Sequence, residues 1–304
     1  MRIAILSKGP GNYSTRRLVE EAQARGHDVR VINYTKCYAS IEKNNPVVNY
    51  EGEDLNDIDV IIPRIGASFT RYGSAIVRQF EMRGVYTTTS SIALVRSRDK
   101  LRSMQLLARA GVGIPKTIFS RGLSRDVDEL IEDLGGAPVI IKLARGTHGN
   151  GVVLAETKKA ARSVLQAFYV MDDEGTNIML QEFVKESAGV DIRAIVVGGK
   201  VVASMKRQSL DDDFRSNLHQ GGEGRLVKLT DEERKVAQKA AKAMGLQVCG
   251  VDMMRSDRGP LVLEVNSSPG FGIEHVTGRN VAAKIIEYVE QNARGKRRRD
   301  RVGA

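Results

Sequence analysis

Lys142-Leu-Ala-Arg-Gly-Thr-His-Gly-Asn-Gly151 lies between two apolar runs, 138–143 and 152–155, that are rich in β-branched residues. Such runs predict strands, so the segment is predicted to be a strand, a glycine loop and a second strand. A Walker A loop and a dinucleotide fingerprint have other spacings and open a helix. Glycines 146, 149 and 151 permit positive φ and let backbone N–H groups approach a ligand.

Lys142 sits in a run too apolar to leave an ammonium without a negative partner. Phosphate oxygens would supply that partner. The alternative is an ordinary glycine-rich hairpin whose lysine reaches to solvent, because long basic side chains often do so. The loop by itself leaves both interpretations open.

The composition limits the class of protein. A chain of 304 residues suits one large or two modest domains. It contains no apolar run of the roughly 20 residues that a membrane span needs. The first residues are interpreted as a strand and not as a signal peptide. Cys37 and Cys249 are far apart, which argues against a disulfide framework and favours a reducing, cytoplasmic setting.

The net charge of +10 is unevenly distributed. Residues 294–304 contain six basic residues and one acid, so this tail carries half of the excess. A basic end of this kind is either a solvated, disordered tail or an arm that contacts an acidic partner. In the second case rRNA phosphates or an acidic peptide would be its targets.

The first hundred residues alternate between strand and helix patterns. Glycines follow both predicted helices, where they would cap the carboxyl end. This βαβ order predicts an open parallel sheet, and Pro63-Arg64-Ile-Gly66 ends its third strand, where such sheets bind ligands. The predicted strands are 2–6, 28–32, 58–63 and 85–88, and the predicted helices are 15–25 and 74–83.

The remaining chain mixes helices with antiparallel hairpins. Gly198-Gly199 predicts a tight turn between two strands, and Thr230-Asp-Glu-Glu233 is a capping box for a helix that ends near Gly245. There is no internal repeat. The predicted helices are 98–110, 127–134 and 158–169, and the predicted strands are 116–119, 177–184, 191–197 and 200–206.

A second hairpin carries two acids and an amide. Ser256-Asp-Arg-Gly259 predicts its turn, which places Asp252 opposite Glu264 or its neighbour. Glu264 and Asn266 are two residues apart and therefore share a strand face. Adjacent carboxylates repel unless a cation lies between them, and these three hard oxygen ligands suit Mg²⁺ held with phosphates. The alternative is an exposed strand face with incidental acids.

Further charged residues lie between the two hairpins. Arg215 and Asn217 stand beside Gly221-Gly222 in a segment able to grip an oxyanion. Asp191 and Arg193 share a strand face, and Lys206-Arg207 ends the next strand. Each could be a plain surface charge, but together they would line the space between a triphosphate and a carboxylate.

The chain contains, in the order typical of the ATP-grasp superfamily, Lys100, Lys142 with the glycine loop, Gln181-Glu-Phe-Val184, and Asp252 with Glu264-Val-Asn266. Beyond that, it closely resembles the RimK family, the ribosomal protein glutamate ligases. The resemblance runs from residue 1 to about 291. Its departures are the loop residues Arg145-Gly-Thr-His-Gly-Asn150 and the basic tail. It is carried by Pro63-Arg64-Ile-Gly66, Arg98-Asp-Lys-Leu-Arg-Ser-Met-Gln-Leu-Leu-Ala108, Gly135-Gly-Ala-Pro138, Val152-Val-Leu-Ala-Glu-Thr157, Gln181-Glu-Phe-Val184, Asp213-Phe-Arg-Ser-Asn-Leu-His219 and Glu264-Val-Asn-Ser-Ser-Pro-Gly270.

The resemblance implies a mixed α/β and α+β architecture, an ATP-grasp fold preceded by an open parallel, Rossmann-like pre-ATP-grasp domain. It would comprise a pre-ATP-grasp domain (1–97), a small ATP-grasp subdomain with the glycine loop (98–186), a C-terminal ATP-grasp subdomain (187–291) and the basic tail (292–304).

The resemblance also implies roles for individual residues. The ATP phosphates would meet Lys100, Lys142, Gly146, Gly149 and Gly151, while Glu182 and Phe183 would offer backbone groups to adenine. Asp191 would lie near the ribose. Arg215, Ser216 and Asn217 would lie near the phosphates and the transferred group, with Arg193 and Arg207 as further catalytic residues. Two Mg²⁺ ions, or Mn²⁺, would be held by Asp252, Glu264 and Asn266.

The implied activity is ATP-dependent addition of L-glutamate to the C-terminus of small-subunit ribosomal protein number six, through an acyl phosphate, with ADP and phosphate released. One alternative keeps this chemistry but uses a small coenzyme or glutamate itself as acceptor. Another is a ribosome- or RNA-binding protein that uses ATP as a switch. The resemblance implies a homotetramer, while the composition predicts a cytoplasmic protein without membrane contact.

Overall fold

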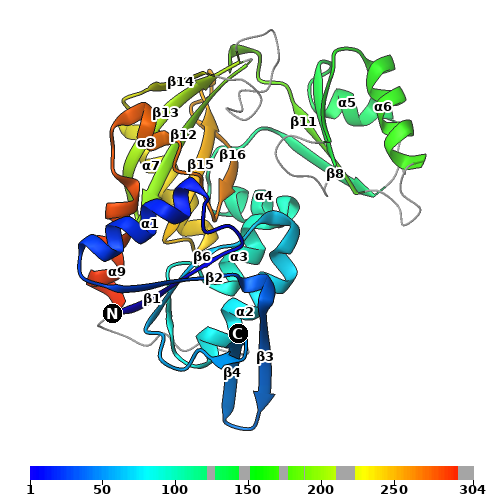
Figure 1. Cartoon of the computed structure of the whole chain (residues 1–304). Coiled ribbons are helices and arrows are strands. Elements are labelled where there is room, and N and C mark those ends of the chain that lie inside the picture. Colours follow the sequence, from blue (N-terminus) through cyan, green and yellow to red (C-terminus); the bar gives the residue numbers. More distant parts are fainter. Residues whose placement is uncertain (122–126, 144–150, 171–176, 188, 210–222, 294–304) are drawn as a thin grey trace.

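The amino-terminal part of the computed structural model is a parallel sheet, as predicted. The structure describes residues 1–121, 127–143, 151–170, 177–187, 189–209 and 223–293 (Figure 1). The sheet has the order β2-β1-β6-β7, and each neighbouring pair is parallel. Its strands are β1 (Arg2–Ser7), β2 (Asp28–Ile32), β6 (Val60–Arg64) and β7 (Tyr86–Thr87).

Two helices connect these strands, and glycine ends both of them. α1 (Tyr13–Ala24) and α2 (Thr70–Met82) begin a few residues earlier than predicted. Gly26 and Gly84 have φ of 76° and 75°, the left-handed conformation that glycine adopts without a Cβ clash. Arg64 is the last residue of β6 and therefore lies at the carboxyl edge of the sheet, where parallel sheets bind ligands.

A small antiparallel sheet was not predicted. It comprises β3 (Cys37–Glu42), β4 (Asn45–Tyr50) and β5 (Glu53–Asp54). Most of β3 is exposed, including Ile41 at 85%, so no alternation of apolar and polar residues marks it as a strand. Its pairing depends instead on a turn at Asn44, which has positive φ.

The predicted helix over 98–110 is wrong at its start, because the chain breaks between two helices. α3 (Ser91–Arg98) ends at Asp99, and α4 (Lys100–Arg109) begins there. The Asp99 carboxylate accepts a hydrogen bond from Arg102 N at 2.9 Å, as an N-cap does. The cap starts a new helix and turns the chain so that Arg98 and Lys100 stand at a helix junction.

The strand–loop–strand prediction is confirmed on both sides of the glycine loop. β9 (Val139–Leu143) and β10 (Val152–Ala155) are antiparallel and pair Lys142 with Val152. They belong to a sheet of order β10-β9-β11-β8, with β8 (Thr117–Arg121) and β11 (Asn177–Glu182). Helices α5 (Val127–Asp133) and α6 (Lys158–Val170) pack on it.

The third sheet contains the predicted acidic hairpin. Its order is β14-β13-β12-β15-β16, and every neighbouring pair is antiparallel. The predicted capping box opens α7, and Gly245 ends that helix with φ 72°. The elements are β12 (Val190–Val197), β13 (Lys200–Gln208), β14 (Glu223–Leu226), β15 (Val248–Met254), β16 (Leu261–Asn266) and α7 (Asp231–Met244).

The C-terminal segment returns to the first sheet. α8 (Ile273–Thr277) and α9 (Val281–Ala293) follow β16, and Figure 1 shows α9 beside α1. One buried cluster joins Ile3 and Leu18 from the amino-terminal part with Phe271 and Ile285. The short 3₁₀ turns are η1 (Tyr34–Lys36), η2 (Ala67–Phe69) and η3 (Lys185–Ser187). Across the described ranges, no helix is both long and apolar enough to cross a membrane.

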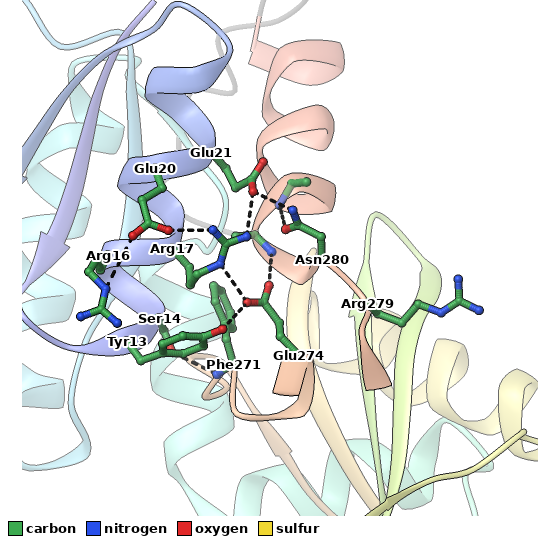
Figure 2. Close-up of polar contacts among 12 residues, drawn as sticks. Tyr13, Ser14, Arg16, Arg17, Glu20, Glu21, Phe271, Glu274, Arg279 and Asn280 are labelled. Carbon is green, nitrogen blue, oxygen red and sulfur yellow. Dashed lines mark hydrogen bonds and ion pairs between the residues drawn. The ribbon is translucent and has the colours of Figure 1, made fainter. Parts of the chain in front are cut away.

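A polar network joins α1 to α8 and to the loop that precedes α8 (Figure 2). The Glu274 carboxylate, 8% exposed, accepts hydrogen bonds from Tyr13 Oη at 3.0 Å, Arg17 Nε at 3.1 Å and Ala282 N at 3.0 Å. Phe271 N donates to Ser14 Oγ at 3.0 Å. These contacts hold residues 271–274 against the amino-terminal part of the chain.

We expect Glu274→Ala to lower the free energy of unfolding by about 1–3 kcal/mol, because it leaves the buried Ala282 N–H without an acceptor. Urea denaturation measures the change. The control is Glu287→Ala, which removes a half-exposed carboxylate paired with Arg25 and should cost less than about 1 kcal/mol. Equal losses in both variants would contradict the role given to Glu274.

Candidate active site

The acidic hairpin brings its three oxygen-bearing side chains together. Asp252 on β15 lies directly opposite Glu264 on β16, which confirms the predicted pairing. Asn266 Nδ2 lies 2.7 Å from Glu264 Oε1 and 3.4 Å from Asp252 Oδ2. Because of this strand pairing, two carboxylates and one amide lie together on one face of the sheet.

This donor set fits a divalent cation. Carboxylate and amide oxygens are the hard ligands that Mg²⁺ accepts. The Asn266 amide nitrogen, a partial positive charge, bridges both carboxylates. Rotation of that amide would turn its oxygen toward the same point. The described residues contain no group of three or more His, Cys, Asp or Glu side chains that could hold a metal, and in this hairpin the third oxygen belongs to an amide.

Two arginines surround the Asp252 carboxylate. Arg193 donates to it through Nε at 2.7 Å and Nη2 at 2.5 Å, and Arg207 Nη2 lies 3.0 Å from Oδ2. Burial opposes ionisation of this carboxyl group, but the two guanidinium groups outweigh burial and hold its pKa well below the usual range. Asp252 is therefore ionised at neutral pH.

Arg207 is shared between two acids. It also forms a two-point pair with the buried Asp191 carboxylate on the neighbouring strand β12. Both carboxylates keep the pKa of Arg207 above its usual value against the effect of burial. The repulsion expected between the hairpin carboxylates is thus offset partly by arginines. Arg193 and Arg207, expected to be catalytic, are directed at carboxylates of the sheet.

Two lysines face the hairpin from other elements. Lys100 at the start of α4 donates from Nζ to the Leu143 carbonyl at 3.0 Å, which ties α4 to the strand that carries Lys142. Burial lowers the pKa of Lys142 to about 8, with Glu264 opposing this shift and Lys100 adding to it. The pKa of Lys100 is also lowered by burial and opposed by Glu264. The structure therefore brings both lysines into the field of the acidic hairpin.

Several predicted residues lie outside the described part of the chain. Gly151, at the end of the loop, has φ 75°, as expected for a glycine turn. The undescribed residues are Gly146, Gly149, Arg215, Ser216 and Asn217, together with Thr147, His148 and the basic tail.

Glu182 is the last residue of β11, and Phe183 follows it. The Glu182 main chain bonds to Lys116 O at 3.0 Å, and its carboxylate accepts from Lys116 N at 2.6 Å and Arg258 Nη2 at 2.5 Å. Phe183 is half-buried. These contacts place both residues at the junction between the second sheet and the third.

Two arginines near the acidic hairpin, Arg64 and Arg98, were not among the site residues predicted from the sequence. Arg64 Nη2 donates to Pro269 O at 2.6 Å and lies with its guanidinium 4.9 Å from the Phe271 ring centre. Arg98 Nη2 donates to Ile65 O at 2.9 Å. Burial and the nearby Arg98 lower the pKa of Arg64 to about 10. The position of Arg64 at a strand end was the one available signal, and nothing in the sequence indicated its contact with the loop after Asn266.

We expect nucleotide binding to take up a proton through Lys142. Its pKa of about 8 would rise beside a phosphate, so above pH 8 ADP binding should protonate this lysine. Calorimetry of ADP binding in buffers of different ionisation enthalpy measures the uptake. Lys142→Met should abolish it, and an equal uptake in both proteins would contradict the prediction.

Comparison with known protein families covers nearly the whole chain. Residues 97–289 match a family model described as the RimK-like ATP-grasp domain. Residues 1–94 match a model described as the RimK PreATP-grasp domain.

Individual relatives agree with these matches. A probable alpha-L-glutamate ligase of Hydrogenovibrio crunogenus is 58% identical over 295 residues, 97% of each chain. The RimK domain ATP-grasp protein of Sphaerobacter thermophilus is similar in structure, with a TM-score of 0.72, 19% identity and coverage of 95% and 99%. The ATP-grasp ligase PsnB, complexed with a minimal precursor, Mg and ADP, has a TM-score of 0.72, 18% identity and coverage of 96% and 98%.

Proposed function

Because the chain belongs to the RimK family of ATP-grasp ligases and is an ADP-forming carboxylate–amine ligase, we propose that it adds L-glutamate to a protein C-terminus. The acceptor that we propose is small-subunit ribosomal protein number six. The acceptor is proposed from the family resemblance alone. The addition of glutamate is supported by the name of the relative at 58% identity and by the convergence of Asp252, Glu264 and Asn266.

The proposed reaction has two steps. An oxygen of the acceptor carboxylate attacks the γ-phosphorus of ATP, which forms an acyl phosphate and releases ADP. The amine of glutamate then attacks the acyl carbon, an amide forms, phosphate leaves, and the amine loses a proton. Positioning two substrates in this way can contribute about 7–11 kcal/mol.

The roles of the side chains follow from their charge. Lys100 and Lys142 would bind ATP phosphates, with Gly151 at the end of the loop beside them. Asp252, Glu264 and Asn266 would hold Mg²⁺, or Mn²⁺, in a site proposed to take two ions. The ions would neutralise charge on the phosphates. Arg193 and Arg207 would orient the Asp252 carboxylate, since both donate to it.

The other proposed roles rest on the resemblance. The backbone groups of Glu182 and Phe183 would meet adenine, and Asp191 would lie near the ribose. Arg215, Ser216 and Asn217 would contact the phosphates and the transferred group, and Gly146 and Gly149 would cover the phosphates. The enzyme is proposed to be a cytoplasmic homotetramer whose basic tail contacts rRNA or an acidic peptide.

One experiment tests this function. The pure protein is incubated with ATP, Mg²⁺, L-glutamate and the ribosomal protein, and products are identified by chromatography and intact mass. We expect ADP and phosphate, with mass added in glutamate steps. AMP and pyrophosphate would refute the acyl phosphate. Glutamate chains formed without the ribosomal protein would replace the proposed acceptor with glutamate itself.

A further inference from the structure

Arg64 and Arg98 differ from the other two arginines of the site in their hydrogen-bond partners. Arg193 and Arg207 each form a two-point pair with a carboxylate of the third sheet. Arg64 and Arg98, by contrast, donate to the main-chain carbonyls of Pro269 and Ile65. No described carboxylate forms an ion pair with either of them.

These two guanidinium groups come from neighbouring elements. Arg64 ends β6, and Arg98 ends α3. Arg98 bonds to the carbonyl of Ile65, the residue directly after Arg64. Each guanidinium carries five N–H donors, and one carbonyl satisfies only part of that fork. Burial and the nearby charge of Arg98 both lower the pKa of Arg64. The hydrogen bond from Arg98 to Ile65 holds the end of α3 against the end of β6.

The loop that Arg64 contacts also has unused polar atoms. In that loop, Ser267 Oγ and Ser268 Oγ are buried and have no hydrogen-bond partner in the described part of the structure, and the same holds for Nε of Arg98 at the end of α3. Buried polar atoms are normally satisfied, and a group of them beside a functional site indicates a ligand that supplies the missing partners. Ser267 and Ser268 directly follow Asn266, so this group adjoins the proposed metal site.

Charge decides what ligand would bind there. The proposed function already assigns ATP phosphates to Lys100 and Lys142 and the metal to the acidic hairpin. Arg64 and Arg98 then have no assigned ligand. Two guanidinium groups with hydroxyls nearby suit a planar carboxylate that is bound at two points. The proposed reaction has two carboxylate-bearing substrates, the acceptor and the incoming glutamate.

We propose that Arg64 and Arg98 bind a carboxylate of an amino-acid substrate at the carboxyl end of β6, next to Ser267 and Ser268. This inference rests on the proposed function and extends it to the recognition of substrate. The arginines hold the carboxylate close to the metal-binding hairpin without covalent participation in the reaction.

The experiment uses the full-length enzyme with Arg64→Met and Arg98→Met, and measures KM for L-glutamate, for the ribosomal protein acceptor and for ATP. We expect KM for one carboxylate substrate to rise about 10- to 100-fold, since a charge-assisted hydrogen bond is lost. KM for ATP should stay within about twofold. Arg64→Lys and Arg98→Lys should recover only part of the loss, because lysine lacks the planar fork.

The substrate whose KM rises identifies the source of the carboxylate. A rise for glutamate assigns the incoming amino acid, and a rise for the ribosomal protein assigns the acceptor. If the KM for glutamate rises, two analogues identify which of its carboxylates is bound: glutamine lacks the side-chain carboxylate, and glutamate α-amide lacks the α-carboxylate. The wild-type enzyme should discriminate against one of them, and the Arg64→Met and Arg98→Met variants should lose that discrimination. Loss of discrimination is a readout that a purely structural arginine would not change.

The matched control is Arg83→Met. Arg83 is also half-buried and donates to two main-chain carbonyls, those of Leu55 and Asn56, but it follows α2 at the opposite end of the sheet from Arg64. Arg83→Met should change the free energy of unfolding and leave the KM values for all three substrates unchanged. If the Arg64 and Arg98 variants behave like this control, with unchanged KM values, the subsite is refuted while the ligase function stands. A wild-type protein without ligase activity would instead refute the proposed function.

Discussion

Glu264→Gln is expected to lower kcat/KM of the ligase reaction by about 100-fold or more, with the fold intact. Glu264 is exposed on β16, and it contributes favourably to the charged state of Lys100 and Lys142. Removing its charge would weaken the proposed metal site, which consists of two carboxylates and an amide. Groups that stabilise charge in the transition state contribute strongly to the rate. Because the side chain is exposed, the free energy of unfolding should change by less than about 1 kcal/mol.

The measurement combines kinetics with a direct reading of metal binding. Mn²⁺ bound in the presence of ADP is counted by electron paramagnetic resonance, and activity is followed as Mg²⁺ is raised. Asp257→Asn is the control, since Asp257 is an exposed acid in the turn of the same hairpin. Glu264→Gln with wild-type Mn²⁺ affinity would remove this residue from the proposed metal site.

Asp252→Asn is expected to abolish activity and also to destabilise the fold by about 3–5 kcal/mol. The side chain is 3% exposed and pairs with Arg193 and Arg207. Without its charge, Arg193 becomes a buried cation that lacks its partner, and breaking a buried pair on one side has a cost of this size. Arg207 retains Asp191. Urea denaturation at neutral pH measures the difference.

A double variant tests whether Asp252 and Arg193 stabilise the fold through their ion pair. Asp252→Asn combined with Arg193→Met removes the unpartnered cation, so the double variant should be more stable than Asp252→Asn alone. A double variant whose loss equals the sum of the two single losses would show that no coupling exists between these side chains.

The contribution of Asp252 also depends on pH. Its pKa is lower in the folded protein than in the unfolded chain, where it is about 3.9. The stabilisation is therefore complete above that value and is lost as the pH falls through the folded pKa. The stability difference between wild type and Asp252→Asn should shrink only in this acid range. A difference that declines already between pH 7 and 5 would contradict this assignment.

The two substitutions probe different parts of one hairpin. Both remove one carboxylate charge, but Glu264 is exposed and Asp252 is buried between arginines. Loss of activity without loss of stability is expected in the first, and loss of both in the second. Equal stability losses would mean that burial does not distinguish their roles.

Local features were predictable from the sequence. The Ser256–Gly259 turn fixes the register of its hairpin, so the sequence predicts that Asp252 lies opposite Glu264 or its neighbour. The capping box at Thr230 and the glycine at 245 likewise depend on neighbours within a few residues. The small sheet of β3 and β4 was not predictable in this way, because β3 is almost entirely exposed and the buried residues of β4 are consecutive instead of alternating.

Sequence alone determined the two hairpins, the parallel amino-terminal sheet and the pairing of Asp252 with Glu264, since periodicity and turn residues act over short separations. Only the tertiary structure decided which charges meet. The Arg64 contact with Pro269 spans 205 residues, and the Arg193 contact with Asp252 spans 59. No local pattern encodes such pairs, because they form only when the first sheet, the third sheet and the returning C-terminal segment bury one common core.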